Sequence, residues 1–229
     1  MAALKAVLFD CDGTIADSAG LICDIMERCF LVHGLEPPAR EATRSIIGLS
    51  LNTAIAALRP SLTAFEVARL ADAYRSEYRL ERSRPHFAEH LFEGMVELVL
   101  DLAARENVFV GMVTGKSRRG VAALTASHGL TGAFSVVRTA DDCPSKPHPA
   151  MVLESCGELG LKPASAVVVG DTSFDMEMAR AAGSTAIGVS WGSHAPEHLM
   201  RSGSLQVTET VQDLSAALDR WLAREPART

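Results

Sequence analysis

Short runs of apolar residues recur along the chain, and within each run nearly every position is apolar rather than every second one. Such runs are typical of strands buried on both faces of a parallel sheet. Segments with helical spacing of apolar residues separate most of them. The alternation predicts an α/β fold with a doubly wound, Rossmann-like parallel sheet. The predicted strands are residues 5–10, 108–114, 134–139, 166–170 and 185–190.

The stretch between the first predicted strand and residue 94 lacks any strand pattern. Its pattern predicts helices at residues 20–33, 39–47, 52–58 and 64–82. Thr63 and Glu66 predict a capping box at the start of the last helix. An all-helical insert at this point predicts a cap domain over the carboxyl ends of the strands, where open α/β sheets bind ligands. We expect residues 17–84 to form the cap, and residues 1–16 and 85–229 to form the catalytic core.

Composition and charge narrow the class of protein. A chain of 229 residues with 48% apolar and 22% charged residues is long enough for one core and a small second domain. Its formal net charge of −6 disfavours a nucleic-acid partner, since such proteins usually carry a basic surplus. No apolar run approaches the roughly 20 residues of a membrane helix. Five irregularly spaced cysteines do not form a disulfide pattern. We therefore expect a cytoplasmic protein with no membrane partner.

Acidic residues lie at the ends of two of the predicted strands. Asp10 ends the first strand and Asp12 follows it, and Asp171 and Asp175 come after the fourth. Carboxyl ends of parallel strands meet at one edge of a sheet, so these four acids are expected to lie close together. Close carboxylates repel one another unless a cation lies between them. Their oxygens are the hard ligands that Mg²⁺ prefers.

A hydroxyl group and an ammonium group follow the other two strands of this core. Thr114 and Gly115 end the second strand just before a helix, an arrangement that can bind an anion. Lys146 lies in the loop after the third strand, where its charge would offset the repulsion between the acids. Lys116 is expected to be a solvated residue in the first turn of the following helix.

Taken in order, these segments resemble the four motifs of the haloacid dehalogenase superfamily. FDCDGTIADS resembles the first motif, Thr114 the second, Lys146 with Pro147 the third, and GDTSFDMEMARAAG the fourth. GVSWG followed by HAPEHL resembles the next segment of phosphoglycolate phosphatase-like members. The helical insert matches the cap domain of that family in position and size.

The resemblance implies a role for each strand-end residue. Asp10 would be the nucleophile that forms an aspartyl-phosphate. Asp12 would protonate the leaving oxygen and then activate water. Thr114, the Gly115 amide and Lys146 would hold the phosphoryl oxygens. The residues implied to contact the phosphate are Asp10, Cys11, Asp12, Thr114, Gly115 and Lys146, and the thiol of Cys11 is expected to be inert.

The resemblance also implies a Mg²⁺ site. Asp171 would bind the ion together with the Asp10 carboxylate and the Asp12 backbone carbonyl. Asp175 would be either a further ligand or a partner of the ligands, and both options stay open. The expected function is thus a Mg²⁺-dependent phosphatase that acts on a small phosphorylated metabolite, similar to phosphoglycolate phosphatase.

Other activities remain as alternatives. An inorganic pyrophosphatase or a sugar-phosphate mutase of the same family would use the same core, although Leu51 replaces the Arg that a mutase usually carries there. The absence of Lys between residues 21 and 87 counts against a phosphonate hydrolase. A non-catalytic binding protein is a further alternative. Substrate selection is expected from the cap, at the turn 48–52 and at Arg40 and Arg44, which would suit a second anionic group.

Overall fold

The computed structural model describes residues 3–85 and 87–224. Within these residues, six parallel strands form one sheet in the order β3-β2-β1-β4-β5-β6. This order is that of a doubly wound sheet, in which the strand order reverses between the neighbouring strands β1 and β4. The predicted α/β fold is therefore confirmed. The strands are β1 (Lys5–Phe9), β2 (Val108–Val113), β3 (Val136–Arg138), β4 (Ala166–Gly170), β5 (Thr185–Val189) and β6 (Val207–Thr208).

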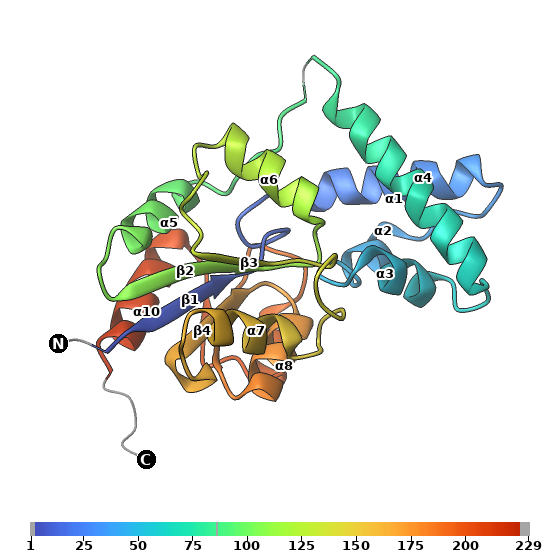
Figure 1. Ribbon diagram of the computed structural model, residues 1–229. Coiled ribbons are helices and arrows are strands. Elements are labelled where there is room, and N and C mark those ends of the chain that lie inside the picture. Colours follow the sequence, from blue (N-terminus) through green and yellow to red (C-terminus); the bar gives the residue numbers. More distant parts are fainter. Residues whose placement is uncertain (1–2, 86, 225–229) are drawn as a thin grey trace.

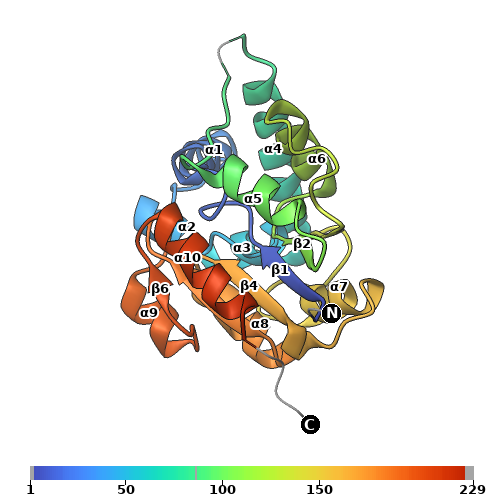
Figure 2. The same ribbon diagram turned by 90° about the vertical axis from the view of Figure 1, so that its left-hand side faces the viewer.

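Helices cover both faces of the sheet (Figures 1 and 2). The helices that pack on one face are α5 (Met95–Ala103), α6 (Arg118–Ser127) and α10 (Val211–Leu222). The helices on the other face are α7 (Ala150–Glu158), α8 (Ser173–Ala182) and α9 (Pro196–Arg201), and the short 3₁₀ turn Pro163–Ser165 precedes β4. Successive residues of β1 divide between the two layers: Val7 and Phe9 pack in the first, and Ala6 and Leu8 in the second. Burial on both sides explains the continuous apolar runs in the sequence.

Four helices between β1 and residue 83 extend beyond the carboxyl edge of the sheet (Figure 1). They are α1 (Ala19–Val32), α2 (Arg40–Arg44), α3 (Leu51–Leu58) and α4 (Ala64–Arg82). α1, α3 and α4 share an apolar cluster of their own, which includes Phe30, Ile55 and Leu70. The capping box of Thr63 and Glu66 is present, as predicted. The domain bounds at residues 17 and 85 stay a prediction.

The edges of the predicted elements differ slightly from the structure. β1 and β2 end one residue earlier than predicted, so Asp10 and Thr114 lie immediately after them. The helix predicted at residues 39–47 ends earlier, because α2 ends at Arg44. The sequence pattern does not predict the elements α9, β6 and α10. β6 spans two residues, too few for a recognisable run. None of the helices in the described ranges is sufficiently long and apolar to cross a bilayer.

Candidate active site

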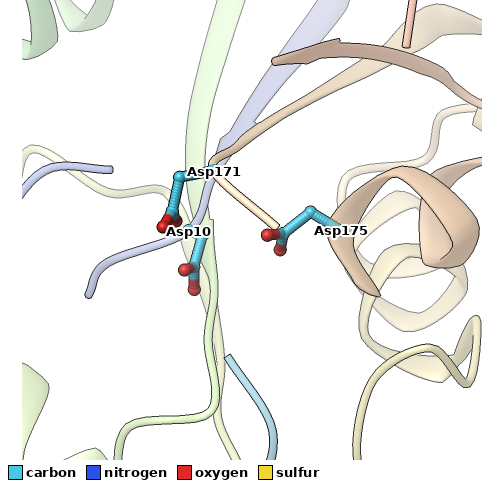
Figure 3. A group of neighbouring side chains, drawn as sticks. All are labelled: Asp10, Asp171 and Asp175. Atoms are coloured by element: carbon cyan, nitrogen blue, oxygen red, sulfur yellow. The ribbon is translucent and has the colours of Figure 1, made fainter. Parts of the chain in front are cut away.

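Three buried carboxylates meet at the point where the strand order reverses. Asp10 directly follows β1, Asp171 directly follows β4, and these strands are neighbours in the sheet. Asp175 lies in the first turn of α8. All three residues are fully buried, and one carboxylate oxygen from each lies within 4.8 Å of the others. Figure 3 shows Asp10 and Asp171 at the strand ends and Asp175 reaching toward them from the helix. Three of the four acids that the sequence predicts to lie close together therefore do so.

Lys146 places its ammonium group between two of these carboxylates. Its Nζ donates to Asp10 Oδ1 at 2.7 Å and to Asp175 Oδ1 at 2.6 Å, and its side chain is fully buried. Burial opposes the charge of Lys146, but the two carboxylates outweigh it and raise its pKa above the ordinary value. Burial also raises the pKa of Asp10 to about 8, with Lys146 acting in the opposite direction. The lysine therefore partly compensates the buried negative charge.

Asp171 lies in a cradle of backbone and hydroxyl groups. Its Oδ1 accepts from Thr14 Oγ1 at 2.9 Å, and its Oδ2 accepts from the Ser193 amide at 2.7 Å. Two glycines close around the carboxylate: a Cβ added at Gly13 or at Gly192 would lie 2.2 Å from an atom of Asp171. Burial, followed by Asp175, raises the pKa of Asp171 to about 7. Any side chain at these glycines would displace the carboxylate.

The three acids suit a divalent cation. Asp10 Oδ2 is buried and has no hydrogen-bond partner within the described residues. The three carboxylates lie close together and Lys146 contacts two of them, so negative charge remains uncompensated in a buried site. Asp175 differs from the other two, because its Oδ2 accepts from the backbone and hydroxyl of Thr172 in a capping box and its Oδ1 accepts from Lys146. Asp10 has an unpartnered oxygen, and each oxygen of Asp171 accepts from a single uncharged donor, so these two carboxylates are better placed than Asp175 to bind a metal ion.

Thr114 and Gly115 lie where the helical segment meets the core. Thr114 is buried, and its amide continues the ladder with β3 by donating to the Arg138 carbonyl at 3.0 Å. Gly115 lies directly under the turn between α2 and α3. A Cβ at Gly115 would lie 2.6 Å from the Leu49 carbonyl oxygen and 2.7 Å from that of Gly48. The close approach of the two backbones requires a glycine here.

Cys11 lies between the first two acids, but its side chain points away from them into the core. It is fully buried in the apolar cluster on the side of α5 and α10. Burial, followed by the charge of Asp12, raises the pKa of its thiol well above the ordinary value. A protonated, buried thiol is unreactive.

The expectation that Lys116 is solvated is wrong. Its side chain is buried, and its Nζ lies 2.8 Å from both Asp12 Oδ1 and Glu89 Oε1. Ser18 also donates to Asp12 Oδ1, at 2.7 Å, and Tyr78 of α4 donates to Glu89 Oε1 at 2.9 Å. Asp12 therefore has its own cation, separate from the Lys146 group. The sequence places Lys116 directly after Thr114 and Gly115, and this position next to a strand end is the signal that could have indicated a role in the site. Its partners Asp12, Glu89 and Tyr78 come from distant segments of the chain, so the sequence pattern does not predict its burial.

A cavity of about 620 Å³ lies between the helical segment and this edge of the sheet. Asp10, Asp12 and Thr114 line it on the core side, and the turn 48–52 lines it on the helical side, as predicted for that turn. Arg40 and Arg44 do not line it, so the expectation for them is wrong. Both are exposed, and Arg40 pairs with Asp24 at 2.6 Å. The arginines on the cavity wall are Arg75, Arg79, Arg82 and Arg119.

Comparisons with known proteins agree with this geometry. The chain is 29% identical over 223 residues to a phosphoglycolate phosphatase of Photorhabdus laumondii, covering 94% of this chain and 92% of that protein. It is 34% identical over 200 residues to an N-acetylmuramic acid 6-phosphate phosphatase of Pseudomonas putida, covering 85% and 86%. The crystal structure of a hydrolase from Pseudomonas syringae superposes with a TM-score of 0.81 at 26% identity, covering 94% and 98%. A family profile described as haloacid dehalogenase-like hydrolase matches residues 7–189. The chain belongs to the haloacid dehalogenase-like hydrolase family.

Proposed function

We propose that this protein is a Mg²⁺-dependent phosphatase that hydrolyses a small phosphomonoester through an aspartyl-phosphate on Asp10. One observation carries the proposal: Asp10 lines the cavity, Lys146 holds its Oδ1, and its Oδ2 has no partner among the described residues. A nucleophile needs such a fixed but uncommitted oxygen. Two similar proteins with phosphatase names, the phosphoglycolate and N-acetylmuramic acid 6-phosphate phosphatases, support the reaction class.

The first half of the reaction transfers the phosphoryl group to the protein. A carboxylate oxygen of Asp10 forms a bond to phosphorus while the bond from phosphorus to the ester oxygen breaks. Asp12 donates its proton to the leaving oxygen. Ser18 and Lys116 both contact Asp12 through Oδ1, which leaves Oδ2 for proton transfer. Lys146 and the hydroxyl of Thr114 stabilise the charge of the phosphoryl oxygens.

The second half returns the protein to its starting state. Asp12, now a carboxylate, accepts a proton from water as the water oxygen bonds to phosphorus. The bond between phosphorus and Asp10 then breaks and releases phosphate. The backbone amides of Cys11, Asp12 and Gly115 would hold the phosphoryl oxygens in both halves.

Asp10, Asp171 and the backbone carbonyl of Asp12 would hold the metal ion in this proposal. Asp175 differs from Asp171 because one of its oxygens accepts from the Lys146 ammonium and the other from two donors of Thr172, which favours a role for Asp175 in holding the lysine. When bound, Mg²⁺ would offset the repulsion between the carboxylate and the phosphate dianion. Residues 17–84 would act as a cap that shields the reaction from bulk water.

Hydrolysis assays on matched variants test the proposal. The unmodified protein is expected to hydrolyse p-nitrophenyl phosphate with Mg²⁺, and Asp10→Asn to lose about a thousandfold or more of kcat, as expected for removal of a nucleophile. Asp17→Asn is the control, since Asp17 is an exposed acid in the same loop and does not line the cavity. Activity that survives Asp10→Asn would contradict the assignment of the nucleophile. Release of phosphate from pyrophosphate alone would favour the pyrophosphatase alternative.

Metal binding has a readout that does not depend on activity. Addition of MgCl₂ is expected to raise the melting temperature of the unmodified protein, because a ligand that binds only the folded state stabilises it. Asp171→Asn is expected to abolish that shift. An equal shift in both proteins would place the ion elsewhere.

A further inference from the structure

Four arginines give the cavity a positive wall beyond its reactive end. Three of them lie on one side of α4, because they follow one another at spacings of four and three residues. They are Arg75, Arg79 and Arg82. Arg119 adds a fourth guanidinium group from α6. All four line the same cavity as Asp10 and Asp12.

Most of this positive charge has no acidic partner in the part of the chain that the structure describes. Among the residues that the structure describes, Arg79, Arg82 and Arg119 form no ion pair. Arg79 donates to the Ser76 hydroxyl at 2.8 Å, and the guanidinium of Arg82 lies 6.0 Å from the Phe87 ring. Only Arg75 has a carboxylate neighbour, the exposed Asp72.

The acids on the cavity wall do not neutralise these arginines. Asp10 and Asp12 are held by Lys146 and Lys116 respectively. Asp141 also lines the cavity, where its Oδ2 accepts from the backbone amide of Arg118 at 2.8 Å and it forms no ion pair with Arg119. The wall formed by α4 and α6 can thus accept an anion that residues 3–85 and 87–224 do not supply.

The volume of the cavity indicates the size of the substrate. Cavities of about 300–1,000 Å³ hold ligands of the size of a drug or a sugar derivative, and this one measures about 620 Å³. Ile46, Leu49 and Tyr74 contribute apolar surface to it. A two-carbon phosphate ester is too small to fill a cavity of this volume.

We infer that the substrate is a phosphomonoester of about the size of a sugar, whose leaving group carries a second anionic group that the α4 arginines bind. The inference rests on the proposed function, and it names the class of leaving group. The shared chemistry is that of an oxyanion, either a carboxylate or a second phosphate, because a guanidinium group binds both through paired N–H donors.

Two pairs of esters test the inference on the unmodified protein. 6-Phosphogluconate and sorbitol 6-phosphate differ by a carboxylate, and glucose 1,6-bisphosphate and glucose 6-phosphate differ by a second phosphate. We expect kcat/KM to favour the more anionic member of at least one pair by about tenfold to a hundredfold, the range for a charge-assisted hydrogen bond. The pair that shows the preference identifies the anion. 2-Phosphoglycolate, which has the carboxylate without the size, is expected to react more slowly than the preferred larger ester.

Substitution of the arginines tests their part directly. Arg79→Gln combined with Arg82→Gln is expected to reduce the preference about tenfold, mainly by raising KM for the anionic ester. Arg69→Gln is the matched control, because Arg69 is exposed on the same helix and does not line the cavity. A preference that is unchanged in the double variant overturns the assignment to these arginines.

The outcomes separate this inference from the function on which it rests. If the protein hydrolyses p-nitrophenyl phosphate but does not distinguish the members of either pair, the inference is wrong and the phosphatase function stands. If 2-phosphoglycolate is the best substrate, the argument from size is wrong. If no ester is hydrolysed, the proposed function fails and the inference fails with it.

Discussion

Lys146 Nζ lies 2.7 Å from Asp10 Oδ1 and 2.6 Å from Asp175 Oδ1, so one buried ammonium group joins the loop after β1 to the first turn of α8. Asp175 in turn caps that helix through Thr172. The candidate nucleophile is thereby connected to a helix N-terminus through a single side chain. Removal of this side chain would leave two buried carboxylates facing one another without a cation.

Lys146→Met is expected to destabilise the protein without added metal by about 3–5 kcal/mol, the usual result of breaking a buried ion pair from one side. Urea denaturation at neutral pH measures the change. Lys162→Met serves as the control, because Lys162 is exposed, and its effect should stay within about 0.5 kcal/mol. Equal stability of the two variants would show that the buried bridge contributes nothing to folding.

Tyr78 and Glu89 link the long helix α4 to the buried Lys116. Tyr78 donates to Glu89 Oε1 at 2.9 Å, and the same oxygen accepts from Lys116 at 2.8 Å. A double-mutant cycle of Tyr78→Phe and Glu89→Gln is expected to give a coupling energy between about 0.5 and 3 kcal/mol, as for residues in one network. A second cycle pairs Tyr78→Phe with Glu106→Gln at an exposed acid, and there the effects should add. Additivity in both cycles would contradict a link through Glu89.

Gly115 is one of the points at which the turn between α2 and α3 contacts the core. Its Cβ would meet the backbone oxygens of Leu49 and Gly48 at 2.6 and 2.7 Å, and backbone cannot move aside as a side chain can. Gly115→Ala is therefore expected to displace the turn, lowering kcat/KM for p-nitrophenyl phosphate by about tenfold to a hundredfold, since small misplacements in a site are costly.

Gly157→Ala provides the matched control for that substitution. Gly157 lies in α7, and an added Cβ there meets no atom within 4 Å. Gly157 is the penultimate residue of α7, so alanine there should stabilise the protein by at most about 0.5–1 kcal/mol, the value for a helix interior, and leave kcat/KM unchanged. If Gly115→Ala behaves in the same way, the close approach of the two backbones is not needed for activity.

The core of the site could be predicted from the sequence because it depends on a general property of parallel sheets. Asp10 and Asp171 follow buried strands that are neighbours in the sheet. Neighbouring parallel strands bring their carboxyl ends together regardless of the conformation of the loops. Thr114 follows the same rule. Lys146 is predicted by charge, since a cluster of acids requires a cation, together with its place in the order of the four motifs. The arguments for Asp10 and Asp171 need only the strand pattern and the residue types.

The side chains that line the cavity from the helical segment could not be predicted in the same way. The bounds of α4 agree with the predicted helix, yet Arg40 and Arg44 were expected at the cavity where the structure has Arg75 and Arg79. Which side of a helix meets the core depends on how α1, α3 and α4 pack, and local spacing does not contain that information. The burial of Lys116 has the same origin, because Tyr78 approaches it from α4.

Glu66 gives the start of α4 a dependence on pH. Its carboxylate accepts from the amide and hydroxyl of Thr63, and these hydrogen bonds lower the pKa of Glu66 below its ordinary value. A carboxylate with a lowered pKa adds stability above the pKa it has in the unfolded chain, about 4.3, and loses that contribution as the pH falls through its pKa in the folded protein.

Glu66→Gln keeps a capping-box side chain without a titrating group. The difference in unfolding free energy between the unmodified protein and this variant is therefore expected to increase in favour of Glu66 as the pH rises from about 3 to 5, and to be constant above that range. Urea denaturation at several pH values measures it, and a difference that does not change between these limits would show that the capping box is not formed in solution.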